Sequence, residues 1–172
     1  MSEAITAATA RDEALEFTHV GIAIPCERGD SVLEATTGGG VRMTALTEFL
    51  AHSAQPEGRP MVVAKRLKDT AGIAAAVRRA RSLLGLPYDY SFRPDNDRYY
   101  CSELIYECYR RPDSLPVFTA RPMNFRAPDG TLPHYWEELF ERLGEPVPEG
   151  LPGTNPNDMA REAALYEVYR WF

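Results

Sequence analysis

The chain has 172 residues, 44% of them hydrophobic, which is enough to bury one core of ordinary size without disulfide staples. The net charge of −6 and the scattered Lys and Arg residues argue against a nucleic-acid partner. Three cysteines are too few for a disulfide framework, and no segment approaches the length of a transmembrane helix.

Residues 1–15 are predicted to form a loose or helical lead-in, followed by a single domain over residues 16–172. The lead-in has no basic stretch followed by an apolar one, which is the pattern of an export signal. We therefore expect a cytoplasmic protein, whose cysteines a reducing environment keeps as free thiols.

The first predicted strand, residues 17–24, places His19 on one face beside the small residues Gly21 and Ala23. A turn centred near Arg28 then leads into a second strand over residues 31–36. This pairing makes Glu34 the diagonal neighbour of His19 on the same face, at a backbone distance of roughly 7–8 Å that the two side chains can close. A slip of one residue would move Glu34 to the opposite face.

Further elements follow from periodicity and from Gly and Pro signals. We predict, in chain order, a strand at 41–43, a helix at 44–52, a strand at 61–67, a helix at 69–84, a long polar and aromatic loop at 86–97, a helix from 101 to about 110, a strand at 116–120, a helix at 135–143 and a coil at 144–157. Residues 164–172 are ambiguous between strand and helix.

The helix that starts at Cys101 is amphipathic. A buried stripe is predicted at i, i+3, i+4 and i+7, and it consists of Cys101, Leu104, Ile105 and Cys108. The charged residues Glu103, Glu107 and Arg110 are predicted to face outward. Because the free amides and the dipole of a helix start favour a thiolate, Cys101 is a candidate nucleophile.

A cysteine nucleophile needs a base and donors for the oxyanion that forms on attack at an acyl carbon. The backbone amides of Cys101 and Ser102 are candidate donors. His19 is the best candidate base, since the small residues beside it leave room for another element, and Glu34 would orient its ring. The alternatives are a cysteine that fills the first turn of a core helix and a half-buried histidine with no catalytic role.

The other polar candidates have weaker settings. His52 lies near a helix end and His134 precedes an aromatic helix, and neither has small neighbours. Tyr88 could donate its hydroxyl to an oxyanion, or it could simply pack on the helix. No Cys, His or carboxylate spacing is typical of a zinc site, so no metal and no cofactor are expected.

Four segments occur in this order: His19-Val20-Gly21-Ile22-Ala23, Val32-Leu33-Glu34-Ala35, Gly85-Leu86-Pro87-Tyr88-Asp89 and Tyr100-Cys101-Ser102-Glu103-Leu104-Ile105. Together they resemble the circularly permuted papain-like enzymes of the NlpC/P60 superfamily, and within it the YiiX/YaeF-like amidases. The similarity spans roughly residues 17 to 155, with the histidine before the cysteine.

The resemblance implies an α+β fold, in which a helix bearing the cysteine packs against an antiparallel sheet or partial barrel bearing the histidine and the acid. It implies a cysteine peptidase or amidase that cleaves or transfers at an amide or ester through an acyl-enzyme. Cys101 would be the nucleophile, His19 the base and Glu34 the orienting acid. Tyr88 would lie near the oxyanion, and Tyr88 and Tyr100 would contact substrate.

The substrate implied by the resemblance is a peptidoglycan-type peptide or a lipid-like or acylated small molecule. Many relatives carry an export signal and this chain shows none, which weakens the case for a cell-wall substrate. The alternative function is a binding module that holds an amino acid, peptide or acyl chain in the same cleft, in keeping with the aromatic approach loop. The choice between hydrolysis and transfer, and the oligomeric state, stay open.

Overall fold

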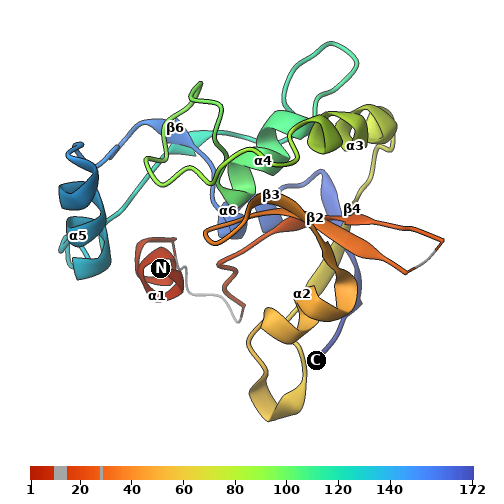
Figure 1. The fold of residues 1–172 in the computed structure, drawn as a ribbon, viewed down its shortest axis with the longest axis horizontal. Coiled ribbons are helices and arrows are strands. Elements are labelled where there is room, and N and C mark those ends of the chain that lie inside the picture. The colour runs from red at the N-terminus through yellow and green to blue at the C-terminus, as the bar shows by residue number, and fades with distance from the viewer. Residues whose placement is uncertain (10–14, 28) are drawn as a thin grey trace.

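A three-stranded antiparallel sheet lies near the centre of the molecule (Figure 1). The computed structural model describes residues 1–9, 15–27 and 29–172. The sheet has the order β1-β2-β3, with β1 at Gly21–Ile24, β2 at Ser31–Thr36 and β3 at Gly40–Ala45. Helices and antiparallel strands occur together, so the α+β architecture is confirmed.

The register of the first hairpin is the predicted one, because Gly21 pairs with Glu34. The first strand is shorter than predicted, and His19 lies just before it. The amide of Phe17 donates to the Asn157 side chain at 2.6 Å, so the chain approaching β1 is tied to another part of the molecule. The turn expected near Arg28 lies outside the described residues.

A second, two-stranded sheet joins segments that are far apart in the sequence. Strand β4 (Val63–Leu67) pairs antiparallel with β7 (Leu165–Arg170), with an irregularity between Ala64 and Lys65. The ambiguous C-terminal segment is therefore a strand. The short strands β5 (Arg121–Pro122) and β6 (Pro152–Gly153) form a third pair, where a coil was predicted for the second of them.

The helices in chain order are α1 (Ser2–Thr9), α2 (Leu46–His52), α3 (Ile73–Ser82), α4 (Cys101–Cys108), α5 (His134–Leu143) and α6 (Pro156–Ala160), with a 3₁₀ turn at Pro56–Gly58. None of the helices among the described residues is long and apolar enough to cross a membrane.

Several predicted boundaries were wrong, for local reasons. Thr44 belongs to β3 and not to the following helix. Helix α3 begins at Ile73 because Gly72, at φ 86°, adopts a left-handed conformation that does not continue a helix. No strand forms at 116–120, where the chain instead folds back on the end of α4 through one isolated bridge between Arg110 and Pro116.

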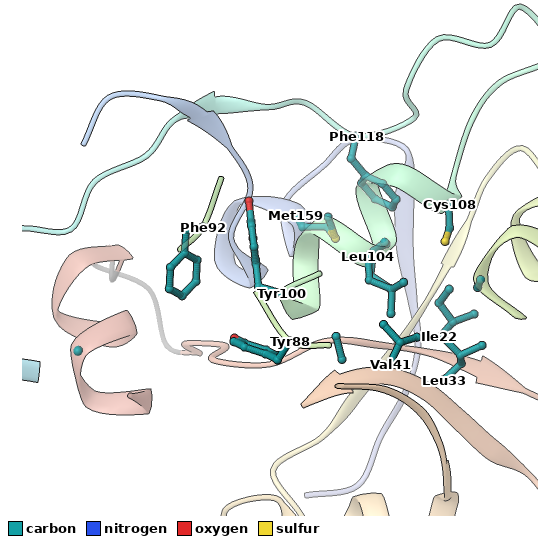
Figure 2. Close-up of a cluster of buried hydrophobic side chains, with 14 of the residues drawn as sticks. Ile22, Leu33, Val41, Tyr88, Phe92, Tyr100, Leu104, Cys108, Phe118 and Met159 are labelled. Carbon is teal, nitrogen blue, oxygen red and sulfur yellow. The ribbon is translucent and has the colours of Figure 1, made fainter. Parts of the chain in front are cut away.

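The core lies between α4 and the three-stranded sheet. Figure 2 shows Leu104 of α4 pointing toward Ile22, Leu33 and Val41 of the sheet. Leu33 and Leu104 are fully buried, and the predicted stripe of Cys101, Leu104, Ile105 and Cys108 is buried throughout. The sheet and α4 are thus held face to face by apolar contacts, which places the start of α4 next to the sheet.

The predicted polar face of α4 was wrong at Glu103, which is buried instead of facing solvent. Its Oε2 accepts a hydrogen bond from the backbone amide of Tyr100 at 3.3 Å. A glutamate in the first turn can cap the helix start in this way, and this contact draws the side chain inward. Glu107 and Arg110 are partly exposed and form an ion pair with each other.

Candidate functional site

Cys101 is the first residue of α4 and is 5% exposed. Tyr100 precedes it in an extended conformation, so the chain turns into the helix at the thiol. The first amides of a helix have no partner within the helix, and those of Cys101 and Ser102 occupy this position. Cys101 therefore lies where backbone donors and the positive end of the helix dipole are concentrated.

A hydrogen-bonded chain joins His19, just before β1, to Glu34 of β2 and Thr44 of β3. His19 Nε2 lies 2.6 Å from Glu34 Oε2, and the Thr44 hydroxyl donates to Glu34 Oε1 at 2.5 Å. Glu34 and Thr44 are both buried, and the ring of Phe49 from α2 packs beside the imidazole at 5.9 Å. These contacts restrict the orientation of the histidine ring.

His19 also interacts with Cys101, and both of its partners affect its pKa. Burial lowers the pKa of His19, but hydrogen bonds with Cys101 and Glu34 and the negative charges of both raise it to about 10. Burial raises the pKa of Glu34, yet its bonds with His19 and Thr44 bring it below the usual value. The structure therefore brings together the three residues that the sequence singled out, from the two sides of the core.

Tyr88 and Tyr100 lie near Cys101. Tyr88 is 6% exposed, and burial together with the nearby Cys101 raises the pKa of its phenol. Its hydroxyl donates to the sulfur of Met1 at 3.7 Å. The Tyr100 hydroxyl accepts from the amide of Thr154 at 3.1 Å, which ties the start of α4 to the chain after β6.

A cavity of about 60 Å³ adjoins Cys101. Its walls are mainly apolar and aromatic, and they include Tyr88, Phe92, Tyr100, Met123, Phe125 and Trp136. Phe92, Phe125 and Trp136 pack edge to face with one another, with ring centroids 5.1–5.7 Å apart. This arrangement is suited to an apolar group next to the thiol.

Several site residues were not predicted from the sequence. Thr44 was placed in a helix, although it is the strand residue that anchors Glu34. Tyr88 and Tyr100, which line the cavity, were predicted to contact substrate, but Phe92, Phe125 and Trp136 have no spacing that relates them to Cys101. The aromatic content of residues 86–100 was the one signal that indicated this wall.

The remaining candidates do not enter the site. Cys26 is exposed, whereas Cys108 is buried at the far end of α4, where burial raises the pKa of its thiol to about 12. The imidazole of His134 is 80% exposed and lies beside Glu137 and Glu138.

The fold has a solved counterpart in the crystal structure of the metalloprotein YiiX from Escherichia coli O157:H7. The two structures align with a TM-score of 0.75 at 26% sequence identity, over 98% of this chain and 89% of that one. Among the residues described here, no group of three or more His, Cys, Asp and Glu side chains is placed to hold a metal ion. We therefore assign no step to a metal.

The sequence comparisons agree with the structural one. The chain is 28% identical over 150 residues to the uncharacterized protein YiiX of Escherichia coli K12, covering 86% of this chain and 68% of that protein. The profile of the permuted papain-like amidase enzymes of the YaeF/YiiX, C92 family matches residues 1–169. The chain belongs to this family of permuted papain-like amidases.

Proposed function

We propose that the protein is a thiol-dependent amidase of the NlpC/P60 type that acts through an acyl-enzyme on Cys101. One observation carries this proposal: His19 is held by Glu34 while it also interacts with the Cys101 thiol. A nucleophile, a base and a group that orients the base are the parts that covalent acyl transfer requires.

The raised pKa of His19 indicates the charge state from which the reaction starts. An imidazolium that persists to about pH 10 has a proton in place at neutral pH that it can donate to a leaving group. Glu34 accepts from Nε2, which leaves Nδ1 for Cys101. Glu34 thus stabilises the positive charge and fixes the tautomer, as the acid of a triad does.

In the first half-reaction the Cys101 sulfur attacks the carbonyl carbon of an amide, and a tetrahedral oxyanion forms. The C–N bond then breaks, His19 donates its proton to the leaving amine, and the acyl group remains on sulfur. In the second half-reaction His19 takes a proton from water or another acceptor, which attacks the thioester and releases the acyl group. An ester would react in the same way with an alcohol as the leaving group.

The oxyanion would be stabilised by the free amides at the start of α4, those of Cys101 and Ser102. Tyr88, which lines the same cavity, would add a hydroxyl donor. Burial and the charge of Cys101 raise its pKa, so the phenol keeps its proton and remains a donor at every pH at which the enzyme would work.

The cavity supports an acyl group with apolar character, because aromatic side chains form most of its wall beside the thiol. A peptide-type amide with an apolar acyl side fits both this wall and the amidase family. A lipid-like acyl donor has the same reactive bond and would differ in the length of the chain that the wall must accept.

The test is acylation by p-nitrophenyl acetate, whose acyl group is small enough for the cavity. We expect a burst of one p-nitrophenol per protein and a mass increase of one acetyl group on the peptide that contains Cys101. Cys101→Ala should abolish both signals, whereas Cys26→Ser, which removes an exposed thiol, should retain them. His19→Ala should slow acylation by about 10²–10⁴-fold.

An acetyl group found on another residue, or on none, would contradict the proposal. A panel of acyl amides and esters, with trapped adducts identified by mass spectrometry, would then define the acyl group. Tight binding of such compounds with no adduct on Cys101 would instead identify a ligand-binding module.

A further inference from the structure

Helix α1 covers the cavity beside Cys101. Ile5, Ala8 and Thr9 of this helix form part of the cavity wall, facing residues of α5 and of the loop before α4. In Figure 1, α1 lies between α5 and the sheet, and in Figure 2 it lies beside Phe92 and Tyr88. Cys101 is only 5% exposed with α1 in this position.

Few polar contacts hold α1 in place. The Asn124 side chain donates to the carbonyl oxygen of Ala8 at 2.8 Å, and the Asn157 side chain donates to the Thr9 hydroxyl at 3.0 Å. Within α1, Ala4 is the one residue that is fully buried. A helix of eight residues that makes only two such hydrogen bonds with the other described residues is an element of low local stability.

The Met1 sulfur accepts a hydrogen bond from the hydroxyl of Tyr88. A thioether sulfur is a weak acceptor, and the separation of 3.7 Å is that of a weak contact. An oxyanion would accept from the same hydroxyl much more strongly, because charged acceptors form the stronger hydrogen bonds. The donor that we assign to the oxyanion is therefore held by a partner that a substrate can replace.

Two buried polar atoms belong to residues that line this cavity, and they have no hydrogen-bond partner among the described residues: Ser102 Oγ and Trp136 Nε1. Buried polar groups are usually paired, so this cluster is unusual. Helix α1 supplies no partner, since its one hydroxyl on the wall, that of Thr9, donates to the Ile5 carbonyl and accepts from Asn157.

We propose that α1 is a displaceable lid, and that the substrate takes its place with an uncharged acyl group that combines apolar surface with a hydrogen-bond acceptor. The apolar part would contact the aromatic wall. The acceptor, such as a carbonyl oxygen, would pair with the donors that α1 leaves unsatisfied. One of them is the Trp136 indole N–H, which can donate but not accept. This inference rests on the proposed function, because it concerns access to the same thiol.

The test is the rate of alkylation by iodoacetamide at Cys101, divided by the rate at the exposed Cys26 in the same sample and measured by peptide mass spectrometry. The opening variant is Ala4→Glu, which would bury an unpaired carboxylate under α1 and so displace it. The matched control is Ser2→Glu, which places the same charge on an exposed residue of the same helix.

We expect the ratio to rise about tenfold or more in Ala4→Glu and to stay within twofold of wild type in Ser2→Glu. Hydrogen exchange of the amides of residues 2–9 shows whether α1 has been released. Release of α1 with an unchanged ratio would overturn the lid. If Ala4→Glu also makes the buried Cys108 reactive, the core has opened, and the milder Ile5→Ser variant decides by the same ratio and the same exchange measurement.

The lid and the proposed function fail in different ways. The proposal that α1 is a lid fails if the rate of alkylation at Cys101 is the same whether α1 is docked or released. That result would leave the proposed function standing, because acetylation of Cys101 tests it separately. The proposed function fails if p-nitrophenyl acetate does not acylate Cys101 in wild type, however much the alkylation ratio rises in the opening variant.

Discussion

At the scale of single residues, the charge of His19 decides how the site works. Burial alone would favour the neutral imidazole, yet the partners on its two sides outweigh burial and raise the pKa to about 10. Glu34 contributes as a carboxylate because its own pKa is lowered by His19 and Thr44. His19 and Glu34 therefore stabilise each other's charged form, and removing one changes the pKa of the other.

We predict that the His19 imidazole titrates near pH 10 in wild type and at a clearly lower pH in Cys101→Ala and in Glu34→Gln. Each variant removes one of the two partners that raise the pKa, so each should lower it part of the way. Nitrogen-15 chemical shifts of the histidine rings against pH measure this directly, and the exposed His134 gives an internal reference. Titration of His19 near its ordinary value of 6.5 in wild type would contradict the assignment.

Glu103 differs from Glu34 in that its pKa is raised, and this shift affects the stability of the fold. Burial and the charge of the fully buried Asp89 raise its pKa to about 8. The folded protein therefore binds a proton at Glu103 between about pH 4.5 and pH 8 that the unfolded chain has released. In that interval the free energy of unfolding falls as the pH rises, and above it the loss is complete.

We predict that Glu103→Gln removes this loss. The amide keeps an oxygen that can accept from the Tyr100 amide but carries no charge to bury. The variant should gain stability relative to wild type between pH 5 and pH 8, by an amount of the order of a few kcal/mol. Urea unfolding at both pH values measures the gain, with the partly exposed Glu107→Gln as control. Parallel curves for wild type and Glu103→Gln would show that Glu103 is ionised in the fold.

At the scale of elements, the pairing of β1 with β2 could be predicted from the sequence more fully than the contacts around it. Alternation along β1 and β2 was enough to predict that Glu34 lies diagonally beside His19, because the period of a strand is fixed and the register follows from the turn. The buried face of α4 followed from helical spacing in the same way. The inward position of Glu103 did not, since a periodicity argument assigns every charge to solvent and ignores capping.

The loop that carries Tyr88 meets β3 at Gly40. This residue has φ 61°, and a Cβ built on it would lie 2.2 Å from the carbonyl oxygen of Leu86. The same carbonyl accepts from the amide of Val41 at 2.8 Å, so backbone contacts position the loop two residues before Tyr88. Only glycine fits both the conformation and the close approach.

We predict that Gly40→Ala displaces this loop, destabilises the protein by more than about 1 kcal/mol and slows acylation of Cys101. The backbone oxygen cannot move aside without losing the Val41 contact, so the strain falls on the segment before Tyr88. Gly38→Ala is the matched control, because nothing lies within 4 Å of its Cβ position. Urea unfolding and the p-nitrophenol burst measure both effects, and equal behaviour of the two variants would refute the role of Gly40.

At the scale of the whole molecule, the site forms because segments far apart in the chain share one core. Glu34 comes from the first sheet, His19 from the segment just before it and Cys101 from α4, whereas the cavity wall comes from α1, the loop before α4, α5 and the later loops. Spacing alone could not show that the sheet meets the helix, since that depends on apolar packing across many residues. The position of α1 over the cavity had no signal either, because its composition fits any short amphipathic helix.

Because Leu33 and Leu104 are fully buried between β2 and α4, the arrangement of His19, Glu34 and Cys101 should be lost together with that contact. We predict that Leu33→Ala lowers the free energy of unfolding by about 2–5 kcal/mol, the usual range for a fully buried leucine. The exposed Leu115→Ala should change it little. Urea curves measured by far-ultraviolet circular dichroism, by the fluorescence of the buried Trp136 and by acylation of Cys101 should have one shared midpoint in each variant. Loss of acylation at a lower urea concentration than loss of helix and fluorescence would show instead that the site opens separately from the core.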